Sequence, residues 1–385
     1  MKIAIKVRIK PTEEQESLLW QSAGTARWAY NWCLNKQIEN HVSGEKFIQD
    51  GILRKELTQL KKTEQYKWLN NVSAQIPKQA IKDCCKAYIS FFNKKTKFPN
   101  FKSRKKSKPS FFIDSYTVET NSDSILIEKI GWLILAEKDR LLIKSKKIKY
   151  YNPRVTYDGK YWYIAVAIDV IANLQKLEKK SLGIDLGLKS FAVCSDGKVF
   201  KNINKSKKVK KVEKKLKRLQ RKVSRKYNLN KKGETFVKTS NIIKEEKKVR
   251  LVYRKLRNIR NNYLHQTSSA IVKTKPSRIV MENLNVRGMM KNKHLSKAIS
   301  QQNFSKFKGY VKYKSELNSI DFVSADRFFP SSKLCSNCGN IKKDLKLSDR
   351  TYVCSICGLV IDRDINASIN LSNYETANNI VTIKT

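Results

Sequence analysis

The sequence has few acidic residues and no long apolar segment. Its 33 Asp and Glu stand against 81 Lys and Arg, a formal net charge of +48 in 385 residues. This excess is larger than solubility requires and is typical of proteins that bind a polyanion, nucleic acid first among them. No apolar run approaches the roughly 18 residues of a membrane-spanning helix, and the first ten residues alternate like a strand rather than resembling a signal peptide. We expect a cytoplasmic protein of two or three domains with no membrane partner.

Cysteine is also scarce, and half of the eight cysteines fall into one motif. Cys335 and Cys338 form one C-x-x-C pair, Cys354 and Cys357 form another, and 15 residues separate the pairs. A glycine follows each pair and frees the turn of a knuckle in which two thiolates converge on one ion. We predict a structural zinc site that leaves no coordination position open for chemistry. The other four are expected to be reduced core thiols rather than parts of a disulfide framework: Cys33, Cys84, Cys85 and Cys194.

Residues 181–200 (SLGIDLGLKSFAVCSDGKVF) place an acid on a predicted inner strand. Apolar residues alternate there with two glycines and Asp185, so the carboxyl projects from one face with no side chain beside it. A polar turn at 195–197 predicts a hairpin with a return strand from Lys198. A carboxylate on an inner strand is costly to desolvate unless a cation or water faces it, which favours a metal as its partner. The alternative is a surface Asp on an edge strand.

The first 175 residues divide into helical and strand patterns. Residues 2–9 alternate as a half-buried strand with a basic outer face. Thr12 and Gln15 match a capping box, and the pattern stays helical to about residue 90. Short alternating runs broken by turns at 110–171 predict a small β-barrel-like module that the first strand completes.

A basic loop follows the helical region. Residues 94–108 (KKTKFPNFKSRKKSK) interleave Phe98 and Phe101 with cations. Cations suit phosphates and exposed rings can stack on bases, so this segment is either a nucleic-acid-binding loop or a charged linker with two anchoring rings.

A second basic segment predicts a helical hairpin. Residues 201–230 carry 14 Lys and Arg and a single acid, Glu213. Apolar residues recur at spacings of three and four over 209–223 and again over 249–263, which predicts two antiparallel helices with packed apolar seams. Their outer faces would form a dense array of cations suited to a nucleic-acid backbone.

Two further acids end or begin predicted elements. The apolar strand 278–281 leads into Glu282, and an acid at the end of a buried strand can serve a site at the sheet edge, although a strand-terminal Glu in solvent is common. Residues 322–328 predict another strand. Asp362 and Asp364 then open a helix. Helix capping explains one Asp well, but it explains two acids around an Arg less well.

Together these motifs resemble the TnpB family, transposon-encoded RNA-guided nucleases related to type V CRISPR effectors. The motifs are GIDLG at 183–187, VMENL at 280–284, the paired cysteine knuckles, and DRDINASINL at 362–371. The opening strand with its PTEEQ helix, the KFPNFKSRKK loop and the basic hairpin also look like the family's, so the resemblance covers essentially the whole chain. Each motif is weak alone and specific in combination.

The resemblance implies an α+β multidomain fold. It consists of an RNase H-like (RuvC) nuclease domain with an inserted basic helical hairpin and a zinc ribbon, preceded by a β-barrel (wedge) domain with a helical recognition insert. The expected bounds are 1–10 and 106–175 for the barrel, 11–105 for the recognition domain, 176–330 and 361–385 for the nuclease domain, 203–265 for its hairpin, and 331–360 for the ribbon.

The resemblance also implies that Asp185, Glu282 and Asp364 are the catalytic carboxylates. Asp362 is the lesser choice, because the family's acid lies two residues before the Asn, here Asn366. Three carboxylates gathered from distant positions need cations, so two Mg²⁺ or Mn²⁺ ions and two-metal phosphodiester hydrolysis, leaving 5′-phosphate ends, are expected. Either Arg327 or Arg363 could supply charge to the transition state, or could equally bind phosphate or a nearby acid. The residues expected to contact nucleic acid are Lys102, Arg104, Lys105, Lys106, Lys214, Lys215, Lys217, Arg218, Arg221 and Arg327.

The implied partners are a guide RNA from the transposon end and target double-stranded DNA. The guide would pair with the target, and roughly the first 175 residues would read a short motif beside it. On DNA the protein would be associated with the nucleoid. Three alternatives stay open: a nuclease-inactive RNA-guided DNA-binding repressor, against which the three acids argue; a conventional DNA transposase; and a zinc-ribbon RNA-binding protein with incidental carboxylates.

Overall fold

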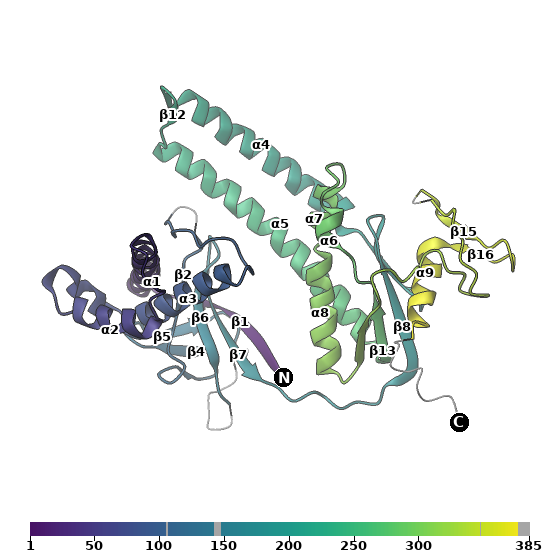
Figure 1. Cartoon of the computed structure of the whole chain (residues 1–385), viewed down its shortest axis with the longest axis horizontal. Coiled ribbons are helices and arrows are strands. Elements are labelled where there is room, and N and C mark those ends of the chain that lie inside the picture. The colour runs from purple at the N-terminus through teal and green to yellow at the C-terminus, as the bar shows by residue number, and fades with distance from the viewer. Residues whose placement is uncertain (105–106, 142–147, 347, 376–385) are drawn as a thin grey trace. The chain divides into compact units, whose positions relative to one another are not determined.

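The structure is a computed structural model that describes residues 1–104, 107–141, 148–346 and 348–375 (Figure 1). The chain divides into two compact units, Met1–Val170 and Ile171–Thr385. Within the described ranges, none of the helices combines the length and apolar character needed to cross a membrane.

The helices of the first unit begin with a well-capped one. The Thr12 hydroxyl accepts the Gln15 N–H at 3.3 Å, and the Gln15 side chain accepts the Thr12 N–H at 3.1 Å, which confirms the predicted capping box. Cys33, Cys84 and Cys85 are buried free thiols in this unit, as predicted. The helices are α1 (Glu13–Val42), α2 (Asp50–Leu60), the 3₁₀ helix η1 (Glu64–Asn71) and α3 (Gln75–Phe92).

A seven-stranded sheet completes this unit, in the order β2-β6-β7-β1-β5-β4-β3. The first strand pairs antiparallel with β7, from Lys2 opposite Asp169 to Ile9 opposite Trp162, so the N-terminal strand does join the module predicted at 110–171. The strands are β1 (Lys2–Lys10), β2 (Ser110–Phe112), β3 (Glu119–Thr120), β4 (Ser124–Ile127), β5 (Gly131–Leu135), β6 (Tyr151–Tyr157) and β7 (Trp162–Asp169).

The second unit is built on a mixed five-stranded sheet, in the order β10-β9-β8-β13-β14. Its central strand β8 carries Asp185, pairs antiparallel with β9 and runs parallel to β13. The inner-strand prediction is therefore confirmed, and the edge-strand alternative is excluded. The strands are β8 (Glu178–Leu186), β9 (Ser190–Cys194), β10 (Val199–Lys201), β13 (Pro276–Met281) and β14 (Asp321–Ser324).

The strand predicted at 322–328 is too long. β14 ends at Ser324, because the next residues turn away from the sheet. There the Asp326 carboxylate accepts the Phe328 N–H at 2.8 Å, and the Asp326 N–H donates to the Tyr374 hydroxyl at 3.1 Å. Side-chain bonds of this kind favour turns over strands.

The predicted basic hairpin is present. Helices α4 (Lys207–Leu229) and α5 (Ser240–Val272) run side by side (Figure 1) and bury one apolar seam that includes Val209, Leu216 and Leu256. Two short strands, β11 (Lys231–Lys232) and β12 (Thr235–Phe236), form the connection. The other helices between β10 and β14 are η2 (Ile203–Lys205), α6 (Val286–Met289), α7 (Ser296–Gln302) and α8 (Phe304–Leu317).

The C-terminal part leads from the cysteine knuckles into a helix. Strands β15 (Thr351–Val353) and β16 (Val360–Asp362) pair antiparallel, and α9 (Arg363–Ser372) follows at once. Asp362 is its N-cap, because its carboxylate accepts the N–H groups of Asp364 and Ile365 at 2.9 and 3.2 Å. Capping thus accounts for Asp362 and leaves Asp364 unexplained.

Candidate functional site

Strand register brings two of the predicted acids together. Met281 of β13 lies opposite Ile184 of the parallel strand β8. The next residues along the chain are Asp185, still within β8, and Glu282, directly after β13, and their carboxyl groups interact with each other. Parallel pairing of two buried strands therefore joins carboxyls that are almost a hundred residues apart in the sequence.

The third acid arrives on α9, which packs directly against β8. Gly183 makes this contact possible: a Cβ atom there would lie 1.9 Å from the Ser368 carbonyl oxygen and 2.4 Å from the Ser372 nitrogen. Only a residue without a side chain allows such an approach of helix to strand. Asp364, in the first turn of α9, consequently interacts electrostatically with both Asp185 and Glu282.

Burial and neighbouring charge raise the proton affinity of two of these acids, Asp185 and Glu282. Burial, then the nearby Glu282 and Asp364 carboxyls, raise the pKa of Asp185 well above its usual range. Burial also raises the pKa of Glu282. The Arg363 guanidinium lies 3.5 Å from Asp364 and opposes both shifts without cancelling them. The cluster therefore needs protons or further positive charge, and carboxyl oxygens are the donors that hard divalent cations prefer.

Ser331 belongs to the same site, although the sequence pattern gave no sign of it. Its buried hydroxyl donates to Glu282 Oε1 at 2.6 Å. This hydrogen bond favours the ionised form of Glu282 and fixes the orientation of that carboxylate. Of the two predicted arginines, Arg363 lies at the acids, whereas Arg327 is exposed in the turn after β14.

The four cysteines of the paired knuckles converge as predicted. Their sulfur atoms all lie within 4.8 Å of one another, with 3.6 Å between Cys335 and Cys357 and 3.5 Å between Cys338 and Cys354. Four sulfurs about 2.3 Å from one tetrahedral ion stand about 3.8 Å apart, so this donor set fits zinc. Hydrogen bonds, first from the Asn337 side chain, lower the pKa of Cys357 to about 6, which favours the thiolate that binds metal.

Replacing one of these cysteines tests the metal site. In Cys354→Ser, zinc content measured by elemental analysis should fall from about one equivalent per chain to near zero, because three thiolates hold the ion far more weakly than four. Ser355→Ala, at an exposed neighbouring position, is the matched control and should keep its zinc. Full zinc retention in Cys354→Ser would contradict the site.

The predicted nucleic-acid residues lie in different settings. Those on α4 are exposed on its outer face, and Arg104 and Arg327 are exposed as well. Lys105 and Lys106 lie outside the described residues. The exposed set on α4 is Lys214, Lys215, Lys217, Arg218 and Arg221.

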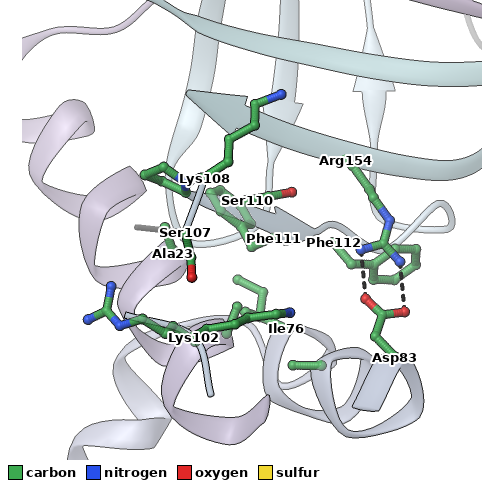
Figure 2. Close-up of a pocket in the computed structure, with 14 residues that line it drawn as sticks. Ala23, Ile76, Asp83, Lys102, Ser107, Lys108, Ser110, Phe111, Phe112 and Arg154 are labelled. Carbon is green, nitrogen blue, oxygen red and sulfur yellow. Dashed lines mark hydrogen bonds and ion pairs between the residues drawn. The ribbon is translucent and has the colours of Figure 1, made fainter. Parts of the chain in front are cut away.

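Lys102 lines a pocket of about 90 Å³ in the first unit (Figure 2). Its backbone is held by Asn31, and its Nζ lies 3.5 Å from the centroid of the Tyr30 ring. Across the pocket, Arg154 donates to both carboxylate oxygens of Asp83, at 2.7 and 2.9 Å. Burial lowers the pKa of Lys102. This lysine is thus anchored at a polar pocket rather than carried on a free linker.

Three family models match the chain in order. A helix-turn-helix domain model of the OrfB type covers residues 1–46, a "Probable transposase" model covers 163–293, and a Cas12f1-like TNB domain model covers 304–371. In this structure the first of these regions folds as strand β1 followed by the single long helix α1 and the turn after it.

Some relatives match over nearly the full length of the chain and others over part of it. A protein of Streptomyces pristinaespiralis named "Putative RNA-guided DNA endonuclease" is 29% identical over 371 residues, 96% of this chain and 89% of that one. "Putative RNA-guided DNA endonuclease InsQ" of Escherichia coli K12 is 27% identical, covering 96% of this chain and 91% of the relative. "TnpB-like protein MJ0751" of Methanocaldococcus jannaschii is 34% identical over 118 residues, 29% of this chain and 41% of that one.

The fold is also shared with a solved structure. The cryo-EM structure of a Cas12f1-sgRNA-target DNA complex contains a chain that superposes with a TM-score of 0.60 at 14% identity, covering 97% of this chain and 99% of that one. This likeness concerns the fold alone. The consecutive family models and the full-length relatives show that the chain is similar to OrfB-type transposases and to proteins named RNA-guided DNA endonucleases along nearly its whole length.

Proposed function

We propose that this protein is an RNA-guided DNA endonuclease of a transposable element, which hydrolyses target DNA at the cluster of Asp185, Glu282 and Asp364. The observation that carries the proposal is the electrostatic interaction of Asp185 on β8 with Glu282, directly after β13, and with Asp364 on α9, in a chain whose full-length relatives bear that name. Neighbouring acids whose pKa values are raised, as those of Asp185 and Glu282 are, are typical of a functional site.

The acids would hold divalent Mg²⁺ or Mn²⁺, and two such ions would activate water and stabilise the leaving oxygen of a phosphodiester. The chain itself supplies the geometry. Parallel strands fix the first two carboxyls, Ser331 orients Glu282, and Arg363 adds one positive charge beside Asp364. The four-cysteine site would hold Zn²⁺ in a structural role, because all four positions are protein ligands.

The domain interpretation is part of the proposal. We assign the mixed sheet of β8, β9, β10, β13 and β14 with α9 to an RNase H-like, RuvC-type nuclease domain. The seven-stranded sheet is assigned to a barrel-like wedge domain, α1 to α3 to its recognition insert, and the segment from 331 to 360 to the zinc ribbon.

Cationic surfaces on both units support nucleic acid as the partner. On α4, exposed Lys and Arg follow the helix opposite its apolar seam. On the seven-stranded sheet, three cations lie over tyrosine rings at 3.4 to 4.6 Å, a mixture of charge and aromatic surface suited to RNA. The pairs are Lys2 with Tyr151, Lys6 with Tyr163, and Arg8 with Tyr161.

The test is to express the protein with its own flanking DNA, purify it and sequence the RNA that copurifies. The proposal expects one RNA from the transposon end, and Mg²⁺-dependent cutting of DNA that matches it. Bound RNA without cutting would favour the RNA-guided repressor, and cutting or joining without any RNA would favour a conventional transposase.

The raised pKa values predict coupling between Mg²⁺ and protons. Because Asp185 and Glu282 bind protons more tightly than ordinary carboxyls, Mg²⁺ must displace protons, so its affinity should rise as pH rises towards the raised pKa values. Each displaced proton changes the affinity by up to about tenfold per pH unit. Calorimetry in two buffers of different ionisation enthalpy counts the released protons. Asp185→Asn should abolish most of the release, and a pH-independent affinity with no release would contradict the cluster's electrostatics.

A further inference from the structure

Two asparagines of α9 hold the segment that connects the acid cluster to the first knuckle. Asn366 and Asn370 lie one helical turn apart, so their side chains project from the same face. The Asn370 amide donates to the carbonyl oxygens of Ser331 and Leu334 at 2.8 and 2.7 Å. The Asn366 amide also donates to the Leu334 carbonyl, at 2.7 Å, and its oxygen accepts the Ser336 N–H at 3.0 Å.

The two asparagines that make these hydrogen bonds are buried, as is Ser331. The exposed fractions of Asn366 and Asn370 are 0% and 4%, and that of Ser331 is 4%. A buried backbone carbonyl without a partner is costly, so removing either amide would force segment 331–336 to shift until its polar groups found others. The two side chains therefore fix the path of this segment, and helix propensity gives no reason for Asn at either position.

The segment has the acid cluster at one end and a metal ligand near the other. Ser331 donates to Glu282 Oε1 at 2.6 Å, while Cys335, four residues later, opens the first knuckle. The same helix carries Asp364 in its first turn. One helix thus holds its own acid directly and orients a second acid through the backbone of Ser331.

We propose that Asn370, with Asn366, is a positioning residue of the nuclease site: it holds the Ser331 hydroxyl against Glu282 and so couples the cysteine knuckle to the geometry of the carboxylates. This inference rests on the proposed function. The asparagines touch neither acid, and they act through segment 331–336. Removing the hydrogen bonds that hold segment 331–336, or the one from Ser331 to Glu282, should leave guide and target binding intact. It should raise the Mg²⁺ concentration that cleavage requires.

The first test is Ser331→Ala, a small change that removes the hydroxyl donor and leaves the fold in place. We expect the half-saturating Mg²⁺ concentration for DNA cleavage to rise about tenfold. Mg²⁺ affinity measured by calorimetry on the protein-RNA complex should fall by the same factor. Ser331→Thr keeps a hydroxyl and should recover most of the affinity. An unchanged Mg²⁺ requirement in Ser331→Ala would overturn the proposal.

The second test is Asn370→Ala, alone and combined with Ser331→Ala. If Asn370 acts through Ser331, the Mg²⁺ requirement of the double variant should resemble that of each single variant. If the two residues act independently, the increases in Mg²⁺ requirement should multiply, and that result would overturn the proposal. Asn373→Ala, at an exposed position of the same helix end, is the matched control and should behave as wild type. Zinc content and guide RNA binding should stay at wild-type values throughout. If Asn370→Ala does not fold, the Mg²⁺ requirements of Ser331→Ala and Ser331→Thr are sufficient to test the proposal.

Failure of the inference and failure of the proposed function give different results. A wild-type protein that neither binds Mg²⁺ nor cuts DNA removes the nuclease assignment itself. A wild-type protein that does both, with a Mg²⁺ requirement unchanged in Ser331→Ala and Asn370→Ala, removes only the positioning role.

Discussion

Asp185→Asn should cut target DNA at least about a thousandfold more slowly than wild type while binding guide RNA and target DNA equally well. The substitution keeps the shape of the side chain and removes the charge of the most strongly perturbed carboxyl in the cluster. Residues that hold reactive metal ions act as a unit, so loss of one is expected to remove most of the catalysis. Binding should persist, because the basic residues assigned to it lie on other elements, among them α4.

The same variant should be more stable than wild type in the absence of divalent cations. Three partly buried carboxyls that lie near one another repel when ionised, and an amide at position 185 removes the repulsion that involves Asp185. A gain of even ~1 kcal/mol would raise the midpoint of thermal unfolding by roughly 2–4 °C. The measurement is thermal unfolding in a chelator at pH 8. Lower stability in Asp185→Asn would mean that the carboxyl has a structural partner instead.

Asp362→Asn is the matched control from the third acidic motif. Asp362 caps α9 through hydrogen bonds to the N–H groups of Asp364 and Ile365. Asn is an equally good N-cap, so cleavage and stability should both stay near wild type. Asp364→Asn should lose cleavage as Asp185→Asn does. The reverse pattern would assign the catalytic role to Asp362.

Gly183→Ala should be among the most damaging single-methyl additions in the chain. The new Cβ would overlap the backbone of α9, at 1.9 Å from the Ser368 carbonyl oxygen, so the helix must move away from β8. Overpacking of this kind costs ~1–3 kcal/mol or more, and an ångström of displacement between reacting groups can cost about a hundredfold in rate. We expect a lowered unfolding midpoint and cleavage reduced at least about a hundredfold.

Gly309→Ala provides the comparison for this change. Gly309 lies within α8 of the same unit, is exposed, and has no atom within 4 Å of the position its Cβ would take. Alanine is the better helix former, so this variant should equal or exceed wild-type stability by up to ~1 kcal/mol and cut normally. Equal behaviour of the two glycine variants would show that α9 does not depend on close packing at Gly183.

The features that the sequence predicted correctly are those that local pattern encodes. Alternation marked β1 and β8, the three-and-four spacing marked the hairpin of α4 and α5, and the knuckle spacing marked a four-sulfur cluster. Each of these patterns lies within one short stretch of sequence or within a pair of short motifs. The resemblance to a family, rather than any periodicity, singled out the three acids as a set.

The features that the sequence did not predict depend on tertiary contact. Ser331 looks like an ordinary loop serine until β13 places Glu282 beside it. The need for Gly183 appears only when α9 lies across β8. From the sequence, Lys102 lies in either a nucleic-acid-binding loop or a charged linker, yet Asn31 and Tyr30 on α1 anchor it at a pocket whose far side is the Asp83–Arg154 ion pair. No spacing rule encodes contacts between segments so far apart in the chain.

The most direct test of the central claim is a cleavage assay with a reprogrammed guide. The purified protein-RNA complex, carrying either its own guide segment or a replaced one, is incubated with Mg²⁺ and two DNA targets that each match one guide. We predict that cutting follows the guide, leaves 5′-phosphate ends, requires the divalent cation, and disappears in Asp185→Asn. Cutting that ignores the guide, or that persists without Asp185, would contradict this prediction.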